Sequence, residues 1–81
     1  MQKLYSKEDK EFLAKIGLKI RVRRLASGLS QEKLAFASKL DRTYIGSVER
    51  GERNISVINL RKISSALKIN LHELLMTEEH E

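Results

Sequence analysis

Residues 29–51 constrain the fold of this chain most, because they divide into two short helical segments separated by a tight turn. Ser30 and Asp41 are placed to cap the two helices, since each side chain can accept a hydrogen bond from a free backbone N–H of the first turn. The helices are predicted over 31–38 and about 42–50. Helices joined this closely must cross and pack, so the segment favours a compact all-α fold.

Helical periodicity continues on both sides of this pair. Further helices are predicted over 7–26, over 57–67, and over about 71–76 behind the cap Asn70. The chain, 1–81, is therefore expected to form one all-α domain of five helices.

The hydrophobic core is predicted from one apolar stripe on each helix, at spacings of three to five residues. Its expected members are Phe12 or Leu13, Ile16, Ile20 and Leu25 in the first helix, Leu34 and Ala37 in the second, Ile45 and Val48 in the third, and Leu60, Ile63 and Leu67 in the fourth.

Charge is distributed unevenly along the chain, whose formal net charge is +5. Residues 1–68 carry all 16 Lys and Arg against seven acids, a balance of +9, whereas 69–81 carry four Glu and no base. Such a basic segment favours a polyanionic partner, which charge alone does not assign to DNA, RNA or an acidic membrane surface. The acidic end, 77–81, is expected to fray.

The expected compartment is the cytoplasm. The sequence holds no cysteine, and Met1–Ser6 lack the apolar stretch of a signal peptide. No apolar run approaches the ~20 residues that cross a bilayer, so we expect no membrane partner.

Enzymatic constellations are lacking in the sequence. His72 and His80 have no partner at metal-ligand spacing, and no glycine-rich loop suits a phosphate. We expect no catalytic residue, metal, cofactor or small-molecule substrate.

The third predicted helix, 42–50, leaves polar groups free once Ile45 and Val48 face inward. Its outer side is then expected to carry Arg42, Thr43, Gly46, Ser47 and Arg50. An arginine can bind guanine through two hydrogen bonds, and a threonine offers a hydroxyl and a methyl group to base edges. Each residue alone suits ordinary solvent exposure, but together they indicate base contact.

Neighbouring residues extend this surface. Gln31 and the free amides around it are placed to hold a phosphate, and Arg53 and Asn54 to reach the DNA backbone or a minor-groove edge. Tyr44 suits a phosphate hydrogen bond and a place over the core equally well.

Glu49 is the one acid in the basic segment 42–50. We expect it to pair with Arg24 and anchor the third helix to the first, so that its loss would damage folding.

The last predicted helix, about 70–76, is unusually apolar, with Leu71, Leu74 and Leu75 as candidate dimerisation residues. The alternative is that two of its apolar residues pack on the first helix. A dimer would space two recognition helices about 34 Å apart and bind a pseudo-palindromic DNA site.

Three stretches of the chain resemble the Cro/lambda-repressor, or xenobiotic-response-element, type of helix-turn-helix. They are Ser30-Gln31-Glu32-Lys33-Leu34-Ala35, Asp41-Arg42-Thr43-Tyr44-Ile45 and Val48-Glu49-Arg50-Gly51, within a likeness that extends from about Ile16 to Leu75. With Arg53 and Asn54, the chain is similar to the controller proteins of bacterial restriction-modification systems.

This resemblance implies a lambda-repressor-like fold and a homodimer, formed by the C-terminal helices, on a palindromic operator in double-stranded DNA. Such controllers activate their own gene and the endonuclease gene, then repress both at higher concentration. The resemblance implies base contacts for Arg42, Thr43 and Arg53, support from Tyr44 and Ser47, and a backbone contact for Gln31.

One residue departs from the family pattern. Lys39 stands where the turn usually carries glycine, and a left-handed conformation there would cost about 1 kcal/mol. A slightly different turn would avoid this cost and tilt the third helix.

Other functions fit the same fold. An antitoxin or phage-type repressor would also bind DNA, whereas a protein-interaction or polymerase accessory module would use the third helix on a protein. RNA polymerase is a candidate further partner of any such regulator.

Overall fold

Five helices account for most of residues 5–76, the part of the chain that the computed structural model describes. They are α1 (Lys7–Ala26), α2 (Gln31–Ser38), α3 (Arg42–Glu49), α4 (Val57–Leu67) and α5 (Leu71–Leu75). Residues 5–76 contain no strand, which confirms the all-α prediction. The predicted bounds differ only at two C-terminal ends, where α3 and α5 each stop one residue early. The acidic end expected to fray, 77–81, lies outside the described residues.

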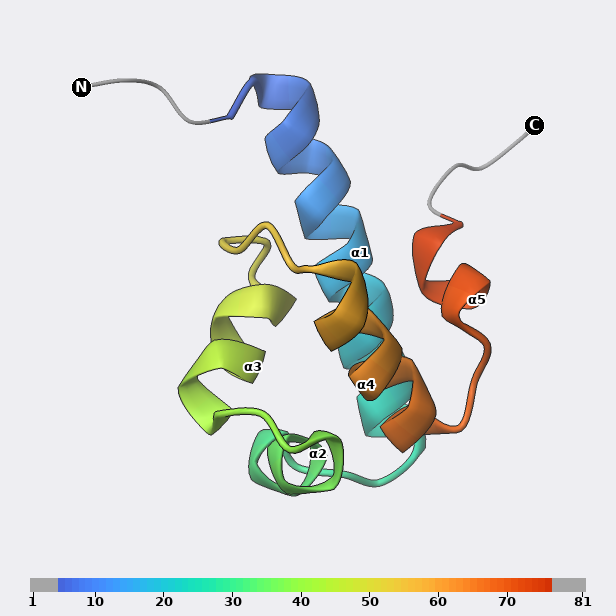
Figure 1. Ribbon diagram of the computed structural model, residues 1–81. Helices are drawn as coiled ribbons and strands as arrows, with labels where there is room; N and C mark the ends of the chain where they lie inside the picture. The colour runs from blue at the N-terminus through green and yellow to red at the C-terminus, as the bar shows by residue number, and fades with distance from the viewer. Residues whose placement is uncertain (1–4, 77–81) are drawn as a thin grey trace.

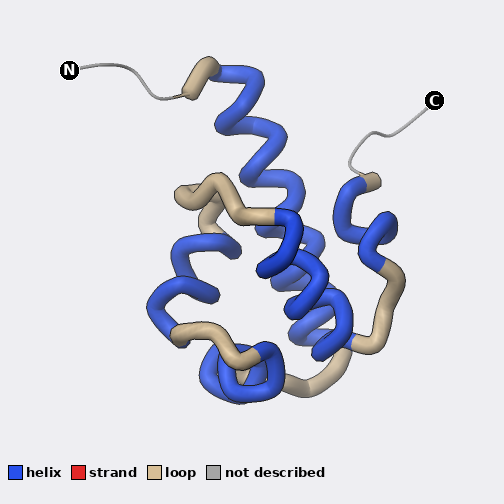
Figure 2. Tube along the Cα trace, viewed as in Figure 1, coloured by secondary structure: helices blue, strands red, loops and turns tan. Residues whose placement is uncertain are grey.

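The helices form a compact bundle in which α4 lies in front of α1 in the view of Figure 1. α2 and α3 pack against each other, with α3 also on α1 and α2 also on α4. α5 contacts α1 and α4 on the side of the bundle opposite to α3 (Figure 1). Figure 2 shows that short loops join the helices, the longest being the one between α3 and α4. None of the described helices combines the length and apolarity needed to cross a bilayer.

Side-chain caps begin four of the helices. Ser6, Ser30 and Ser56 each accept a hydrogen bond from the backbone N–H three residues on, at 3.0 Å. Asp41 accepts from the Thr43 N–H at 2.9 Å and from the next N–H as well. The expected cap at Asn70 is wrong as to its side chain, which makes no such bond. The Glu73 N–H donates instead to the backbone carbonyl of Asn70.

A single cluster of buried side chains joins the helices. It comprises Ile16, Ile20, Leu34, Ala35, Ile45, Val48, Leu60, Ile63, Leu67 and Leu74. Most of the predicted core is therefore correct, and the inward pair on α3, Ile45 and Val48, is confirmed.

Two core predictions, Leu25 and Ala37, fail for reasons of helix geometry. Leu25 is 55% exposed, because Arg24, four residues after Ile20, occupies the inward position and the next residue is turned a further 100°. Of the two alternatives Phe12 and Leu13, Leu13 is the buried residue and Phe12 is exposed. On α2, Ala37 faces solvent, since Ala35 and Ser38 fill the inward positions beside Leu34.

Gly17 marks the closest approach of α1 to α3. A Cβ atom on Gly17 would lie 2.5 Å from the carbonyl oxygen of Glu49 and would also overlap that of Val48. Because both obstacles are backbone atoms, no side-chain rotation could relieve the overlap. The absence of a side chain is therefore what lets the two helices pack this closely.

Gly17→Ala should destabilise the fold by about 3 kcal/mol or more, since overpacking forces the backbone of α3 away from α1. Chemical denaturation of the variant measures this loss. Gly28→Ala is the matched control: Gly28 has a left-handed φ of 73°, but a Cβ atom there would have no neighbour within 4 Å. Only the local strain, about 1–2 kcal/mol, should then appear. Equal losses in the two variants would contradict the close-packing account.

Candidate nucleic-acid interface

The turn between α2 and α3 sets the angle between the two helices. Lys39 is left-handed, with φ 61° and ψ 39°, and its N–H donates to the Phe36 carbonyl. The Leu40 N–H donates back to the Ala35 carbonyl at 2.9 Å, which closes the end of α2. The turn thus keeps the conformation for which glycine is suited, with lysine in its place at a cost of about 1 kcal/mol.

The outer face of α3 carries exposed polar side chains, among them Arg42, Thr43 and Arg50. They surround Gly46, where a Cβ atom would lie 3.4 Å from Arg50 Nη1, 3.5 Å from Gln31 Oε1 and 3.9 Å from Arg42 Nη1. Two guanidinium groups and one amide oxygen therefore converge over a position with no side chain of its own. This arrangement presents donors and an acceptor together on one exposed helix face.

Ser47 does not lie free on this face, contrary to the sequence-based expectation. It is 7% exposed, and its hydroxyl donates to the Tyr44 carbonyl at 2.8 Å. The Glu52 N–H donates to the Ser47 carbonyl at 2.9 Å, which closes the C-terminal end of α3 after the left-handed Gly51. The bound hydroxyl supports the shape of α3 and is not available as a free donor.

Tyr44 covers the core and holds the loop that follows α3. Its half-buried ring packs against the hydrophobic cluster, and its hydroxyl accepts a hydrogen bond from Asn59 Nδ2 at 3.1 Å. The Arg53 guanidinium lies 5.1 Å from the centre of the ring, within cation–π range. Arg53 and its neighbour Asn54 are exposed beside α3, so the loop adds one positioned cation to the surface.

A buried ion pair fixes the end of α3 to the scaffold. Arg24 Nε donates to Glu49 Oε2 at 2.6 Å and Arg24 Nη2 to Glu49 Oε1 at 3.0 Å, so the expected pair is present in two-pronged form. Hydrogen bonding to Glu49 raises the pKa of the Arg24 guanidinium, although burial works against its charge. Arg24 Nη1 also donates to the Leu29 carbonyl at 2.9 Å, in the segment leading into α2.

Gln31 belongs to the same network. Its Nε2 donates to Glu49 Oε1 at 3.0 Å, so the side chain is not simply free for a phosphate as the sequence suggested. The reason is that α2 begins beside the end of α3, within reach of the buried carboxylate. The bond leaves the amide oxygen directed toward Gly46, on the outer face of α3.

Two further ion pairs lie outside the core, one beside the outer face of α3 and one between α1 and α5. Arg50 Nε lies 3.0 Å from Glu52 Oε2, and these hydrogen bonds lower the pKa of the Glu52 carboxyl and raise that of Arg50. Arg23 Nη2 lies 2.6 Å from Glu73 Oε1, and this pair connects α1 to α5.

The three leucines proposed for dimerisation have different environments. Leu74 is fully buried in the core of the protomer, so its place in a dimer surface is wrong: α5 needs that side chain to pack on the bundle. Leu71 is half-buried against the same core. Leu75, 42% exposed, and Met76, 58% exposed, leave an apolar surface at the end of α5.

Two contributors to the site were not predicted from the sequence. Gly17 had a signal, since a glycine within a strongly helical segment indicates close backbone approach. Asn59 had none, because its bond to Tyr44 depends on where the tertiary fold places the first turn of α4. Within residues 5–76, no three His, Cys, Asp or Glu side chains gather as metal ligands.

Comparisons with known proteins identify the family. The helix-turn-helix family model matches residues 20–74. The control protein C.BamHI of Bacillus amyloliquefaciens is 53% identical over 60 residues, which cover 73% of this chain and 74% of that protein. The crystal structure of the restriction-modification controller protein C.AhdI from Aeromonas hydrophila is 55% identical, with a TM-score of 0.76, and the match covers 76% of this chain and 94% of that chain. This chain belongs to the helix-turn-helix family of restriction-modification controller proteins.

The controller family consists of DNA-binding transcription regulators and is not a class of enzymes. Another controller, C.Esp1396I, has a crystal structure as a tetramer in complex with its natural 35-base-pair operator. It is 38% identical, with a TM-score of 0.73, and the match covers 80% of this chain and 90% of that chain. The lambda-repressor-like fold predicted from the sequence thus agrees with the solved controller structures.

Glu49→Gln should destabilise this controller by about 3–5 kcal/mol, because it leaves the Arg24 guanidinium buried without its counter-charge. A urea melt gives the free energy of unfolding. Glu52→Gln is the matched control, since it removes a carboxylate from an exposed arginine pair and should change stability little. Indistinguishable melts for wild type and Glu49→Gln would remove the anchoring role.

Proposed function

We propose that this protein is the autoregulating controller of a restriction-modification system and binds a pseudo-palindromic operator as a homodimer. The observation that carries the proposal is the outer face of α3, where Arg42, Arg50 and the Gln31 amide converge around Gly46. The solved complex of C.Esp1396I with its operator supports it.

In this proposal the chain acts as one DNA-binding domain, since its five helices share one hydrophobic cluster. α3 enters the major groove, which admits one α-helix. Arg42 donates two hydrogen bonds to a guanine and Thr43 contacts the neighbouring base. Arg53 and Asn54 contact the sugar-phosphate backbone of the DNA. Gln31 and Tyr44 position these groups, the first through Glu49 and the second through Arg53.

Dimerisation is assigned to the end of α5, with Leu75 and Met76 as its exposed apolar residues and Leu71 beside them. A second copy covering these side chains removes apolar surface from water, which stabilises a small domain. The twofold arrangement spaces two α3 helices by about 34 Å, one turn of DNA. The operator lies in the cytoplasm, where RNA polymerase is the further partner that a transcription activator requires.

Arg42→Ala should weaken binding to the DNA upstream of this protein's own gene by about 1–3 kcal/mol per half-site, since one two-pronged base contact is lost. A gel shift against the upstream duplex and a scrambled duplex of equal length measures the change. Affinity for the scrambled duplex should change much less. If wild type binds both duplexes equally at moderate salt, sequence-specific regulation is not its function, and a role in protein interaction takes its place.

Leu75→Glu should convert the dimer to a monomer in sedimentation equilibrium, because it places a charge in an apolar contact surface. The monomer should still fold, since Leu75 is 42% exposed within the protomer. Phe36→Glu serves as the matched control, because Phe36 is 87% exposed on α2, away from α5. A Leu75→Glu dimer of unchanged affinity would move the interface elsewhere.

A further inference from the structure

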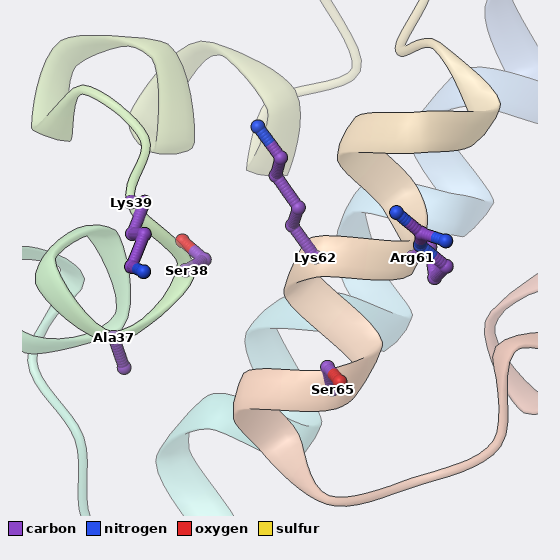
Figure 3. A pocket seen from close by; sticks show the side chains of 6 residues that line it. All are labelled: Ala37, Ser38, Lys39, Arg61, Lys62 and Ser65. Carbon is purple, nitrogen blue, oxygen red and sulfur yellow. The ribbon is translucent and has the colours of Figure 1, made fainter.

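A basic groove lies between the C-terminal end of α2 and the middle of α4 (Figure 3). It has a volume of about 410 Å³ and is lined by Ala37, Ser38, Lys39, Arg61, Lys62 and Ser65. Lys39 stands on the α2 wall, and Arg61 and Lys62 project from the α4 wall. We call this site the α2–α4 groove. It shares no lining residue with the outer face of α3.

The three cations of the α2–α4 groove have no carboxylate partner within residues 5–76. The ion pairs within residues 5–76 involve other residues: Lys7 with Glu11, Arg23 with Glu73, Arg24 with Glu49, and Arg50 with Glu52. Lys39 on α2 and the two cations on α4 give the groove a positively charged lining, and such a lining attracts an anion. The groove therefore suits an anionic ligand.

The lining distinguishes a phosphate from an acidic protein segment. Its apolar part is limited to Ala37, and the other five side chains are lysine, arginine or serine. Protein interfaces are enriched in aromatic residues at their centres and depleted of lysine. Phosphate groups, in contrast, are held by lysine, arginine and serine side chains.

The position of the groove relative to α3 indicates which phosphates it holds. α2 has eight residues and is therefore about 12 Å long, close to the width of a DNA major groove, about 12 Å. Gln31, at the N-terminal end of α2, lies beside the outer face of α3, while the α2–α4 groove opens at the other end. The two ends of α2 can thus stand over the two strands that border the major groove.

We propose that the α2–α4 groove binds phosphate groups of the DNA strand opposite to the one met by the N-terminal end of α2. The inference rests on the proposed operator binding, and it adds Lys39, Arg61 and Lys62 to the DNA-contacting residues. These contacts are electrostatic, so they strengthen binding to any sequence and leave the choice of sequence to α3.

The test compares wild type with a triple variant, Lys39→Gly with Arg61→Gln and Lys62→Gln. Operator affinity is measured over a range of salt concentrations, on the operator and on a scrambled duplex. The plot of log K against log salt has a negative slope, and each lost phosphate contact should make it less steep by about 0.9. The ratio of operator to scrambled affinity should stay within about twofold of wild type, in contrast to Arg42→Ala.

Lys68→Gly is the matched control. Lys68 ends α4 in the same left-handed conformation, φ 60°, but does not line the groove. Lys39→Gly and Lys68→Gly remove the same charge and relieve the same backbone strain, so both should melt at or above the wild-type temperature. Only Lys39→Gly should reduce the salt slope.

An unchanged slope in the well-folded triple variant overturns the proposal, while a wild-type preference for the operator leaves the proposed function intact. Equal wild-type affinity for both duplexes refutes the proposed function instead. Sodium tripolyphosphate at matched ionic strength tests a free phosphate source. If it raises the melting temperature of wild type but not of the triple variant, and the DNA slope is unchanged, the groove serves a small phosphate compound and the strand contact is refuted.

Discussion

The arrangement of this domain depends on the buried pair between Arg24 and Glu49. Their side chains are 8% and 3% exposed, so neither charge has water as an alternative partner. One guanidinium joins three segments: the end of α1, the carboxylate at the end of α3, and the Leu29 carbonyl ahead of α2. Such a pair adds little net stability over apolar packing, but it imposes one geometry, because any other leaves a charge stranded.

The pair works together with close packing along α3. Gly17 lets the backbone of α1 approach the last turn of α3, and Ile45 and Val48 fill the space below. With one face of a helix of only eight residues committed in this way, the rotation of α3 about its axis is set. Arg42 and Thr43 are then directed outward, and their side chains make no hydrogen bond or ion pair with any other residue in 5–76.

The positive charge of the surface follows from how the few acidic residues are used. Glu49 neutralises a buried arginine, Glu52 pairs with Arg50 beside α3, Glu73 pairs with Arg23 between α1 and α5, and Asp41 caps α3. Since these carboxylates are engaged locally, Arg42 on the outer face and the three cations of the α2–α4 groove have no carboxylate partner within residues 5–76, and they give this part of the protein a positive field. Such a field attracts a polyanion and raises its rate of association.

The sequence by itself determined the helices, because caps such as Ser30 and Asp41 and apolar spacing act over one or two turns. It also predicted the polar character of α3, since periodicity is a local property, and the ion pair of Arg24 with Glu49, because a lone acid in the basic segment 42–50 needs a cationic partner. Only the tertiary structure decided which side chains are available at the surface. Ser47, Gln31 and Leu74 were each expected at an outer surface. In the structure the Ser47 hydroxyl donates to the Tyr44 carbonyl, Gln31 donates to the Glu49 carboxylate, and Leu74 lies in the core beneath α5. Burial is set by the packing of whole helices against one another, and no single helix carries that information.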